Sequence, residues 1–230
     1  MPDPEEAPGG RPRSSSAGWD AYVVPMVAFL ALTWFEGRFP RHYPLLYAAK
    51  IAIVAVLMVR YRSAWRDIRF DRSVLLPGAL VGLAVIAAWI AISESVPWAT
   101  VGGGRAAYDP FRQIADPWAR AAFLAVRLFG LAVLVPVMEE LFWRSFLIRA
   151  FTSADWRAAS PGDFSWTAFG LVAAGFSLAH PEWLAAAVCA CAYGLLLRQT
   201  RSLFACVVAH AVSNLALGAY VLTAHAWKYW

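Results

Sequence analysis

Seven long apolar segments most constrain what this chain can fold into. They cover residues 19–35, 44–59, 74–92, 119–137, 164–179, 183–197 and 203–223. A helix needs about 20 apolar residues to cross the hydrocarbon core of a bilayer, with a range of roughly 17 to 25. Hydrophobic residues make up 60% of the 230 residues and charged residues 15%, a balance outside the range of soluble domains. The sequence therefore predicts an all-α, polytopic transmembrane helix bundle of about seven spans.

Arginines in the connections predict how the bundle is oriented. The connection RYRSAWRDIRFDR, residues 60–72, contains five arginines and is expected to be cytoplasmic by the positive-inside rule. The N-terminus and the connections 149–163 and 198–202 then lie on the same side. The fourth segment is expected to continue as helix to about residue 150.

Composition predicts a disordered tail and argues against a nucleic-acid-binding protein and against a disulfide-stabilised protein. Residues 1–18 are rich in Pro, Gly and Ser, which predicts a disordered N-terminal tail. The net charge of +5 comes from basic residues at the ends of apolar segments, so we expect no nucleic-acid partner. The three cysteines all lie in apolar segments, and their odd number argues against a disulfide framework.

A few polar side chains lie inside the apolar segments. An ionisable group costs about 2.5–3.5 kcal/mol at the middle of a membrane helix, so each is a functional candidate. The candidates are Glu139, Glu140, Arg144, His180, His210 and Asn214. Arg127, in the fourth segment, is a further charge to which the sequence assigns no role.

Helical spacing separates the two neighbouring carboxylates. Glu140 and Arg144 are four residues apart, so they share one helix face and can form an ion pair. Glu139 points about 100° away from Glu140 and is left for a different role. His210 and Asn214 are also four residues apart and present an imidazole and an amide side by side.

These groups suit hydrolysis of an amide bond inside a membrane. A carboxylate in a low-dielectric site has a raised proton affinity, which suits a general base. Glu139 is therefore the candidate base, with His180 helping to hold the attacking water. His210 and Asn214 are candidates to donate hydrogen bonds to the oxyanion that forms when water attacks a carbonyl. This chemistry needs neither a cofactor nor a metal ion.

Three motifs occur in order on successive apolar helices. They read EExxxR at residues 139–144, FxxxH at 176–180 and HxxxN at 210–214. This pattern resembles the CAAX-protease and bacteriocin-processing family of glutamic intramembrane endopeptidases, which includes the Rce1-type prenyl-protein proteases. The resemblance covers about residues 120–223.

The resemblance implies a role for each motif residue. Glu139 would activate water with His180 as its partner, and Glu140 and Arg144 would support them. His210 and Asn214 would stabilise the oxyanion. We therefore divide the chain into a tail over 1–18, N-terminal transmembrane helices over 19–118 and catalytic transmembrane helices over 119–230.

The resemblance also suggests a setting and a class of substrate. The chain is similar to the bacterial CAAX-protease-related subgroup encoded with exosortase-type sorting systems, which implies the bacterial inner membrane. The expected partners are the lipid bilayer and a membrane-anchored or lipidated protein or peptide, cut near its C-terminal or membrane-associated part. No prenyl-binding groove can be identified in the sequence, so the substrate stays open.

Other interpretations of the same residues remain. Ser177 in GFSLA with His210 as base would give a rhomboid-type serine protease, and Cys206 with His210 would give a cysteine protease. Glu139, His180 and His210 could in principle bind Zn²⁺. A non-catalytic scaffold, an immunity protein or a transporter would use the same polar cluster structurally.

Overall fold

The structure is a computed structural model that describes residues 17–101 and 107–230. Most of the tail predicted over residues 1–18 lies outside the described residues. The described part contains helices and their connections, and no strand. The main helices are α1 (Asp20–Glu36), α2 (Tyr43–Arg60), α3 (Leu75–Ser95), α4 (Pro110–Gln113), α5 (Pro117–Phe129), α6 (Val135–Glu140), α7 (Ile148–Thr152), α8 (Trp166–Leu178), α9 (Trp183–Thr200) and α10 (Leu203–Ala224).

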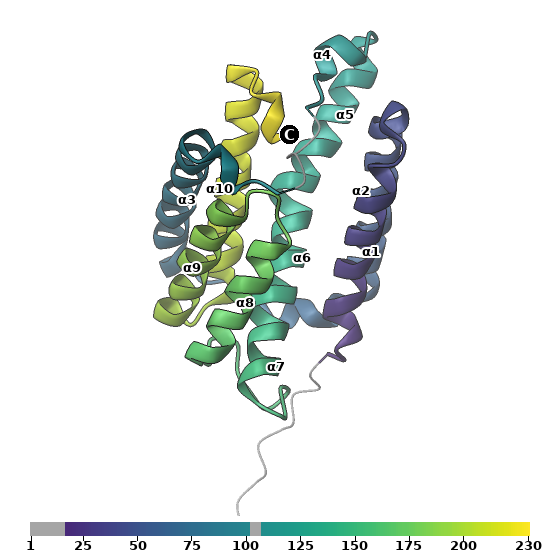
Figure 1. Cartoon of the computed structure of the whole chain (residues 1–230). Coiled ribbons are helices and arrows are strands. Elements are labelled where there is room, and N and C mark those ends of the chain that lie inside the picture. Colours follow the sequence, from purple (N-terminus) through teal and green to yellow (C-terminus); the bar gives the residue numbers. More distant parts are fainter. Residues whose placement is uncertain (1–16, 102–106) are drawn as a thin grey trace, which may run out of the picture.

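The helices form two groups with one long helix between them. Helices α1 and α2 pack as a pair on one side, and α3, α9 and α10 pack together on the other (Figure 1). The long helix runs from α5 to α7 through the middle and contacts both groups. Helix α8 packs against α9 and against the C-terminal part of the long helix. Side chains from both groups can therefore face the long helix.

All seven predicted apolar segments are helical. By length and composition, however, fewer than seven of these helices could cross a membrane. Five helices in the described part are long and apolar enough to span a bilayer, and they cover Pro40–Arg60, Arg72–Ser95, Pro117–Thr152, Trp183–Thr200 and Leu203–Ala224. The remaining two segments form shorter helices, since α1 has 17 residues and α8 has 13. The predicted continuation of the fourth segment to about residue 150 is confirmed, and a break around Pro181 separates α8 from α9.

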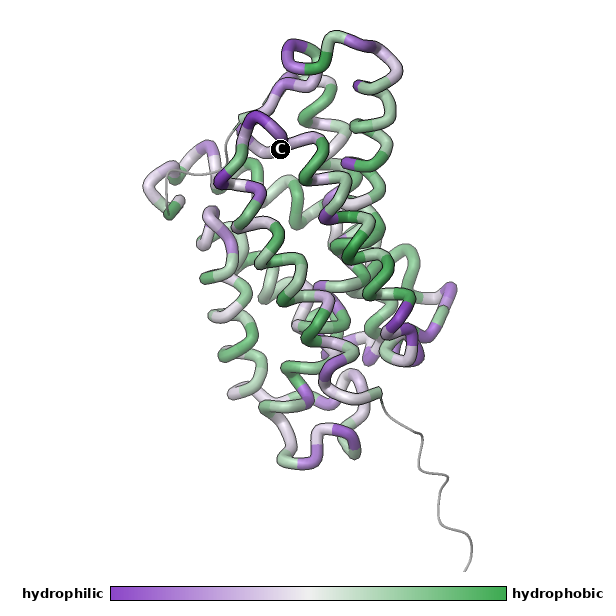
Figure 2. Tube along the Cα trace, turned by 90° about the vertical axis from the view of Figure 1, so that its right-hand side faces the viewer, coloured by the Kyte–Doolittle hydropathy of each residue, from purple (hydrophilic) through white to green (hydrophobic). Residues whose placement is uncertain are grey.

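The outer surface of the bundle is apolar along its length. Side chains such as Leu45, Val56, Leu76 and Leu178 are more than 60% exposed. Figure 2 shows hydrophobic residues along the helices and hydrophilic residues gathered at the two ends. A continuous apolar surface of this kind is stable in contact with lipid and unstable in contact with water.

Polar contacts fix the connections at the two opposite ends. At one end, Asp67 accepts hydrogen bonds from Tyr22 at 2.7 Å, Ser145 at 2.5 Å and Arg149 at 2.6 Å. These bonds tie the start of α1 and the connection after α2 to the end of the long helix. At the other end, Lys228 pairs with Glu94. The arginine-rich connections predicted to share one side do lie at the same end as Asp67 (Figure 1).

The long helix is interrupted by two stretches of wider π-helical turns. The first, η5, covers Gly130–Leu134, and the second, η6, covers Leu141–Leu147. In the first stretch the N–H of Val135 donates to the carbonyl of Gly130, five residues earlier. The next donor in this register would be Pro136, which has no N–H. The carbonyl of Leu131 therefore lacks a backbone donor, which bears on the site below.

Two glycines let α3 approach α10 closely. A Cβ atom built on Gly78 would lie 2.9 Å from the carbonyl oxygen of Ala205, and one built on Gly82 would overlap the carbonyl of Ala209. Glycines four residues apart are a common means of close helix packing in membranes. The contact fixes the face of α10 that carries His210.

Candidate active site

One cavity of about 500 Å³ lies between the two helix groups and beside the long helix. Its walls are mostly apolar and aromatic. Four of the residues predicted from sequence line it, and they come from three separate helical segments: Glu139, His180, His210 and Asn214. The structure thus brings these four residues together around one cavity. Their predicted catalytic roles remain hypotheses.

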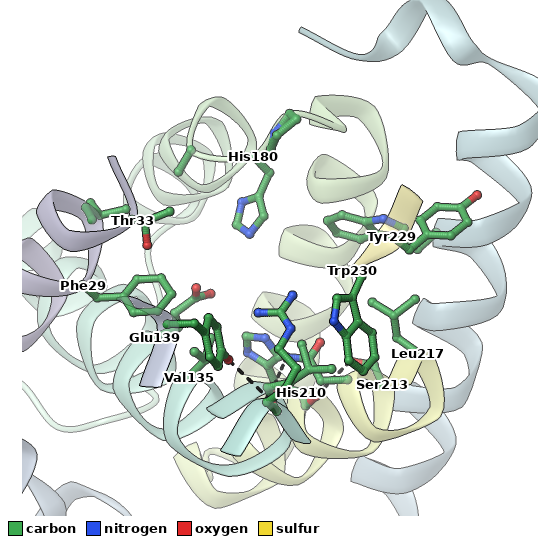
Figure 3. A pocket seen from close by; sticks show the side chains of 18 of the residues that line it. Phe29, Thr33, Val135, Glu139, His180, His210, Ser213, Leu217, Tyr229 and Trp230 are labelled. Carbon is green, nitrogen blue, oxygen red and sulfur yellow. Dashed lines mark hydrogen bonds between the residues drawn. The ribbon is translucent and has the colours of Figure 1, made fainter. Parts of the chain in front are cut away.

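Glu139 and His180 lie on different walls of the cavity and point toward a common space (Figure 3). Glu139 is 6% exposed, and its Oε2 atom is enclosed with no hydrogen-bond partner. His180 follows the end of α8, where its Nδ1 donates to the carbonyl of Phe176 at 2.8 Å. Its ring also packs on the ring of Phe176, with 4.4 Å between centroids. The FxxxH spacing thus fixes the imidazole at the break before α9.

Glu140 lies outside the cavity and is fully buried. Its Oε1 atom accepts from NH1 of Arg144 at 3.1 Å, so the predicted ion pair is confirmed. The same oxygen accepts from Nδ1 of His210 at 2.8 Å, which sequence spacing did not predict. Because Nδ1 is held by Glu140, Nε2 is the ring nitrogen of His210 left for a group in the cavity.

Aromatic rings enclose the guanidinium of Arg144. It lies 4.4 Å from the ring centroid of Phe176 and 5.4 Å from that of Tyr193. Tyr193 also packs on His210 and bonds the hydroxyl of Ser213 at 2.7 Å. Such rings stabilise a desolvated cation. The ion pair of Glu140 and Arg144 therefore supports the cavity wall from behind.

Asn214 is held by the irregular part of the long helix. Its Nδ2 donates to the carbonyl of Leu131 at 2.8 Å. This is the carbonyl that Pro136 leaves without a backbone donor. One N–H of the Asn214 amide is therefore committed to the backbone, and the second remains for a group in the cavity.

The structure does not favour the serine and cysteine alternatives. Ser177 donates its hydroxyl to the carbonyl of Ala173 at 2.7 Å and does not line the cavity. Cys206 is fully buried and directs its thiol to the carbonyl of Tyr193. His210, the base that both alternatives need, is bonded to Glu140.

The zinc alternative also lacks a set of ligands. Across residues 17–101 and 107–230, no three His, Cys, Asp or Glu side chains come together in a way that could hold a metal ion. Glu139, His180 and His210 share a cavity without converging as ligands. All three cysteines are free.

Comparison with known proteins agrees with the three motifs. Residues 121–216 match the family model described as type II CAAX prenyl endopeptidase Rce1-like. These residues are therefore similar to the CAAX-protease family. The match begins within α5, ends within α10 and includes every motif residue from Glu139 to Asn214. No curated protein and no solved structure matches the chain.

Similarity to the CAAX-protease family and the apolar helices together characterise the chain in general terms. It is an integral membrane protein with a helical segment that is similar to the CAAX-type intramembrane proteases. Helices α1–α3 lie outside the matched segment, yet α1 and α2 contribute Phe29, Thr33, Tyr47 and Lys50 to the cavity. Apolar periodicity alone could not show that these side chains face a site.

Proposed function

We propose that the chain is an intramembrane glutamic endopeptidase in which Glu139 activates the attacking water. The observation that carries this proposal is that the two adjacent carboxylates lie in different surroundings. Glu139 faces a cavity shared with two histidines, whereas Glu140 is buried behind it with Arg144. A general base needs access to water, and a supporting acid does not.

The charges around Glu140 support a donor role for His210. Glu139 and Glu140 bring two negative charges, and Arg144 brings one positive charge. A protonated His210 would balance the second carboxylate. With Nδ1–H donated to Glu140, such an imidazolium also carries an Nε2–H toward the cavity. That N–H and the second N–H of Asn214 are the two donors that an oxyanion requires.

The proposed reaction proceeds in two steps. Glu139 takes a proton from water, and the water oxygen attacks the carbonyl carbon of the scissile amide. The carbonyl oxygen becomes the oxyanion and accepts hydrogen bonds from His210 and Asn214. When the C–N bond breaks, the leaving nitrogen takes the proton held by Glu139. The products are a new carboxyl terminus and a new amine, and His180 helps to position the water.

The walls of the cavity support a membrane-associated substrate. They are mainly apolar, and the bundle around them presents an apolar surface to lipid. We infer cleavage near the C-terminal or membrane-anchored part of a protein or peptide. The arginines of residues 60–72 support a cytoplasmic N-terminus in a bacterial inner membrane, and seven helical segments support up to seven crossings.

Substitutions in the native host test the proposal. Glu139→Gln, His180→Ala and His210→Ala are compared with Ser177→Ala and Cys206→Ala, and membrane-protein C-termini are read by mass spectrometry. Uncleaved precursors should accumulate for the first three changes and not for the last two. If all five variants match wild type at normal protein levels, the polar cluster is structural, as in a scaffold or a transporter.

A further inference from the structure

The cavity is displaced toward one end of the bundle. The other end, here called the arginine-rich end, carries the connections 60–72, 149–163 and 198–202 (Figure 1). The cavity-lining residues of α1 and α2 continue to the end away from these arginines, where Glu36 closes α1 and Tyr43 begins α2. The cavity therefore reaches the end of the bundle opposite the arginine-rich end.

The helical turns nearest the arginine-rich end contribute nothing to the cavity. Helices α3 and α10 both begin at that end, yet their first lining residues are Val85 and His210. The long helix finishes there with α7, yet its last lining residue is Glu139. None of the three connections at that end lines the cavity. The cavity thus stops at the level of Glu139 and His210.

Buried side chains fill the long helix between the cavity and the arginine-rich end. Five of them are at most 3% exposed: Leu141, Arg144, Ser145, Ile148 and Arg149. The guanidinium of Arg144 is paired with Glu140, and that of Arg149 is paired with Asp67 at 2.6 Å. Closely packed side chains leave few voids larger than a water molecule, so we expect no route to the cavity from this end.

The cavity has an exposed mouth at the opposite end. Gly37, Pro40 and Ala107 define this mouth, because they line the cavity and are exposed. Thr33, one turn before Gly37 on α1, is also exposed and lines the cavity, so the mouth continues along α1. Figure 3 shows Thr33 and Tyr229 at opposite sides of the cavity in that view.

Hydrolysis itself requires a connection to water. Each bond that is cut consumes a water molecule, so Glu139 needs a route to an aqueous phase. The sides of the bundle are apolar and face lipid, which supplies little water. Within the described residues, the mouth at the end opposite the arginine-rich end is therefore the aqueous route that the cavity offers.

We propose that water and substrate reach Glu139 from the end opposite the arginine-rich end. By the positive-inside rule the arginine-rich end is cytoplasmic, so the mouth opens on the outer side of the membrane. The substrate is then a membrane-associated protein or peptide whose cleaved segment lies on the outer side. A lipid-anchored protein that stays in the cytoplasm would not present its scissile bond here. The inference rests on the proposed endopeptidase function and adds the class of substrate.

Labelling of single cysteines tests the direction of access without cleavage. In the full chain with its three native cysteines changed to alanine, Leu217→Cys places a thiol in the cavity wall. Ser63→Cys marks the arginine-rich end and Arg112→Cys marks the opposite end, since both positions are exposed. A charged methanethiosulfonate reagent is added to one side of sealed membrane vesicles of either orientation.

Leu217→Cys and Arg112→Cys should react from the outer side, and Ser63→Cys from the cytoplasmic side. Each should react at least about tenfold faster from that side than from the other, because a charged reagent does not readily cross the apolar core. Leu215→Cys is the matched control on α10. Leu215 is 55% exposed, does not line the cavity and should react from neither side.

A second cavity position guards against disturbance of α10. Thr33→Cys lies on α1 and should react from the same side as Leu217→Cys. The substrate is then examined in the native host. Precursors that accumulate with Glu139→Gln should have their uncleaved segment digested by a protease added outside sealed spheroplasts.

Several results would overturn the inference. Reaction of Leu217→Cys and Thr33→Cys from the same side as Ser63→Cys would do so, as would equal reaction from both sides. Reaction of Ser63→Cys from the outer side would overturn the outward direction of the mouth. Precursors protected from the external protease would overturn the class of substrate. If no precursor accumulates with Glu139→Gln, the proposed function fails instead, whereas the labelling result still decides the direction of access.

Discussion

The buried carboxylate of Glu140 gives a sharp prediction about stability. Its Oε1 atom accepts from Arg144 at 3.1 Å and from His210 at 2.8 Å, and the three side chains are at most 8% exposed. Glu140→Gln keeps the size of the side chain and removes its charge. The guanidinium of Arg144 then stays buried without a counter-charge. Removing one partner of a buried ion pair costs about 3–5 kcal/mol.

Thermal unfolding in one detergent measures this cost. For a chain of this length, about 2–4 °C of unfolding midpoint corresponds to 1 kcal/mol, so Glu140→Gln should lower the midpoint by roughly 10 °C. Glu139→Gln is the matched control, because it makes the same chemical change one residue away. Since Oε2 of Glu139 has no partner, its midpoint should change by less than about 2 °C.

A double variant separates the cost of an unpaired buried charge from the cost of changing the shape of the side chains. Glu140→Gln with Arg144→Met removes both charges and should recover part of the lost stability, because no unpaired charge stays buried. An unfolding midpoint of Glu140→Gln equal to that of wild type would refute the reasoning. A double variant less stable than Glu140→Gln alone would also contradict it.

Further predictions concern packing and the irregular turn of the long helix. Gly82→Ala should lower the free energy of unfolding by about 1–3 kcal/mol, because its Cβ would overlap the carbonyl of Ala209. Gly170→Ala, measured by the same unfolding assay, should be neutral or stabilising by up to about 1 kcal/mol, since no atom lies within 4 Å of the added Cβ. Asn214→Ala should cost about 1–3 kcal/mol by leaving the carbonyl of Leu131 without a donor, and an unchanged midpoint would show that this bond is dispensable.

Much of the fold follows from local features of the sequence. Apolar length locates each helical segment, because every backbone polar group must be bonded within a helix in lipid. Spacing of four residues gives the pair Glu140–Arg144 directly. The number of crossings is less predictable, because α1 and α8 are near or below the length that a bilayer requires.

The contacts that shape the site are long-range and could not be derived from spacing. His210 bonds a carboxylate 70 positions away, and Asn214 bonds a carbonyl 83 positions away. The second bond depends on a π-helical register that ends at Pro136, and hydropathy carries no signal for such a register. Arg127 also lines the cavity with Glu139, but on a regular helix a separation of twelve residues puts the two side chains about 120° apart, so spacing did not predict this.

Hydrolysis by a purified Glu139→Gln variant tests the central claim most directly. The precursor identified in the host is reconstituted with wild type or with Glu139→Gln in the same vesicles, at equal amounts of folded protein. Loss of a general base typically costs about 10²–10⁴-fold in rate. We predict a loss of kcat/KM of that size with an unchanged unfolding midpoint. Hydrolysis at the wild-type rate would contradict the assignment of Glu139 as the base.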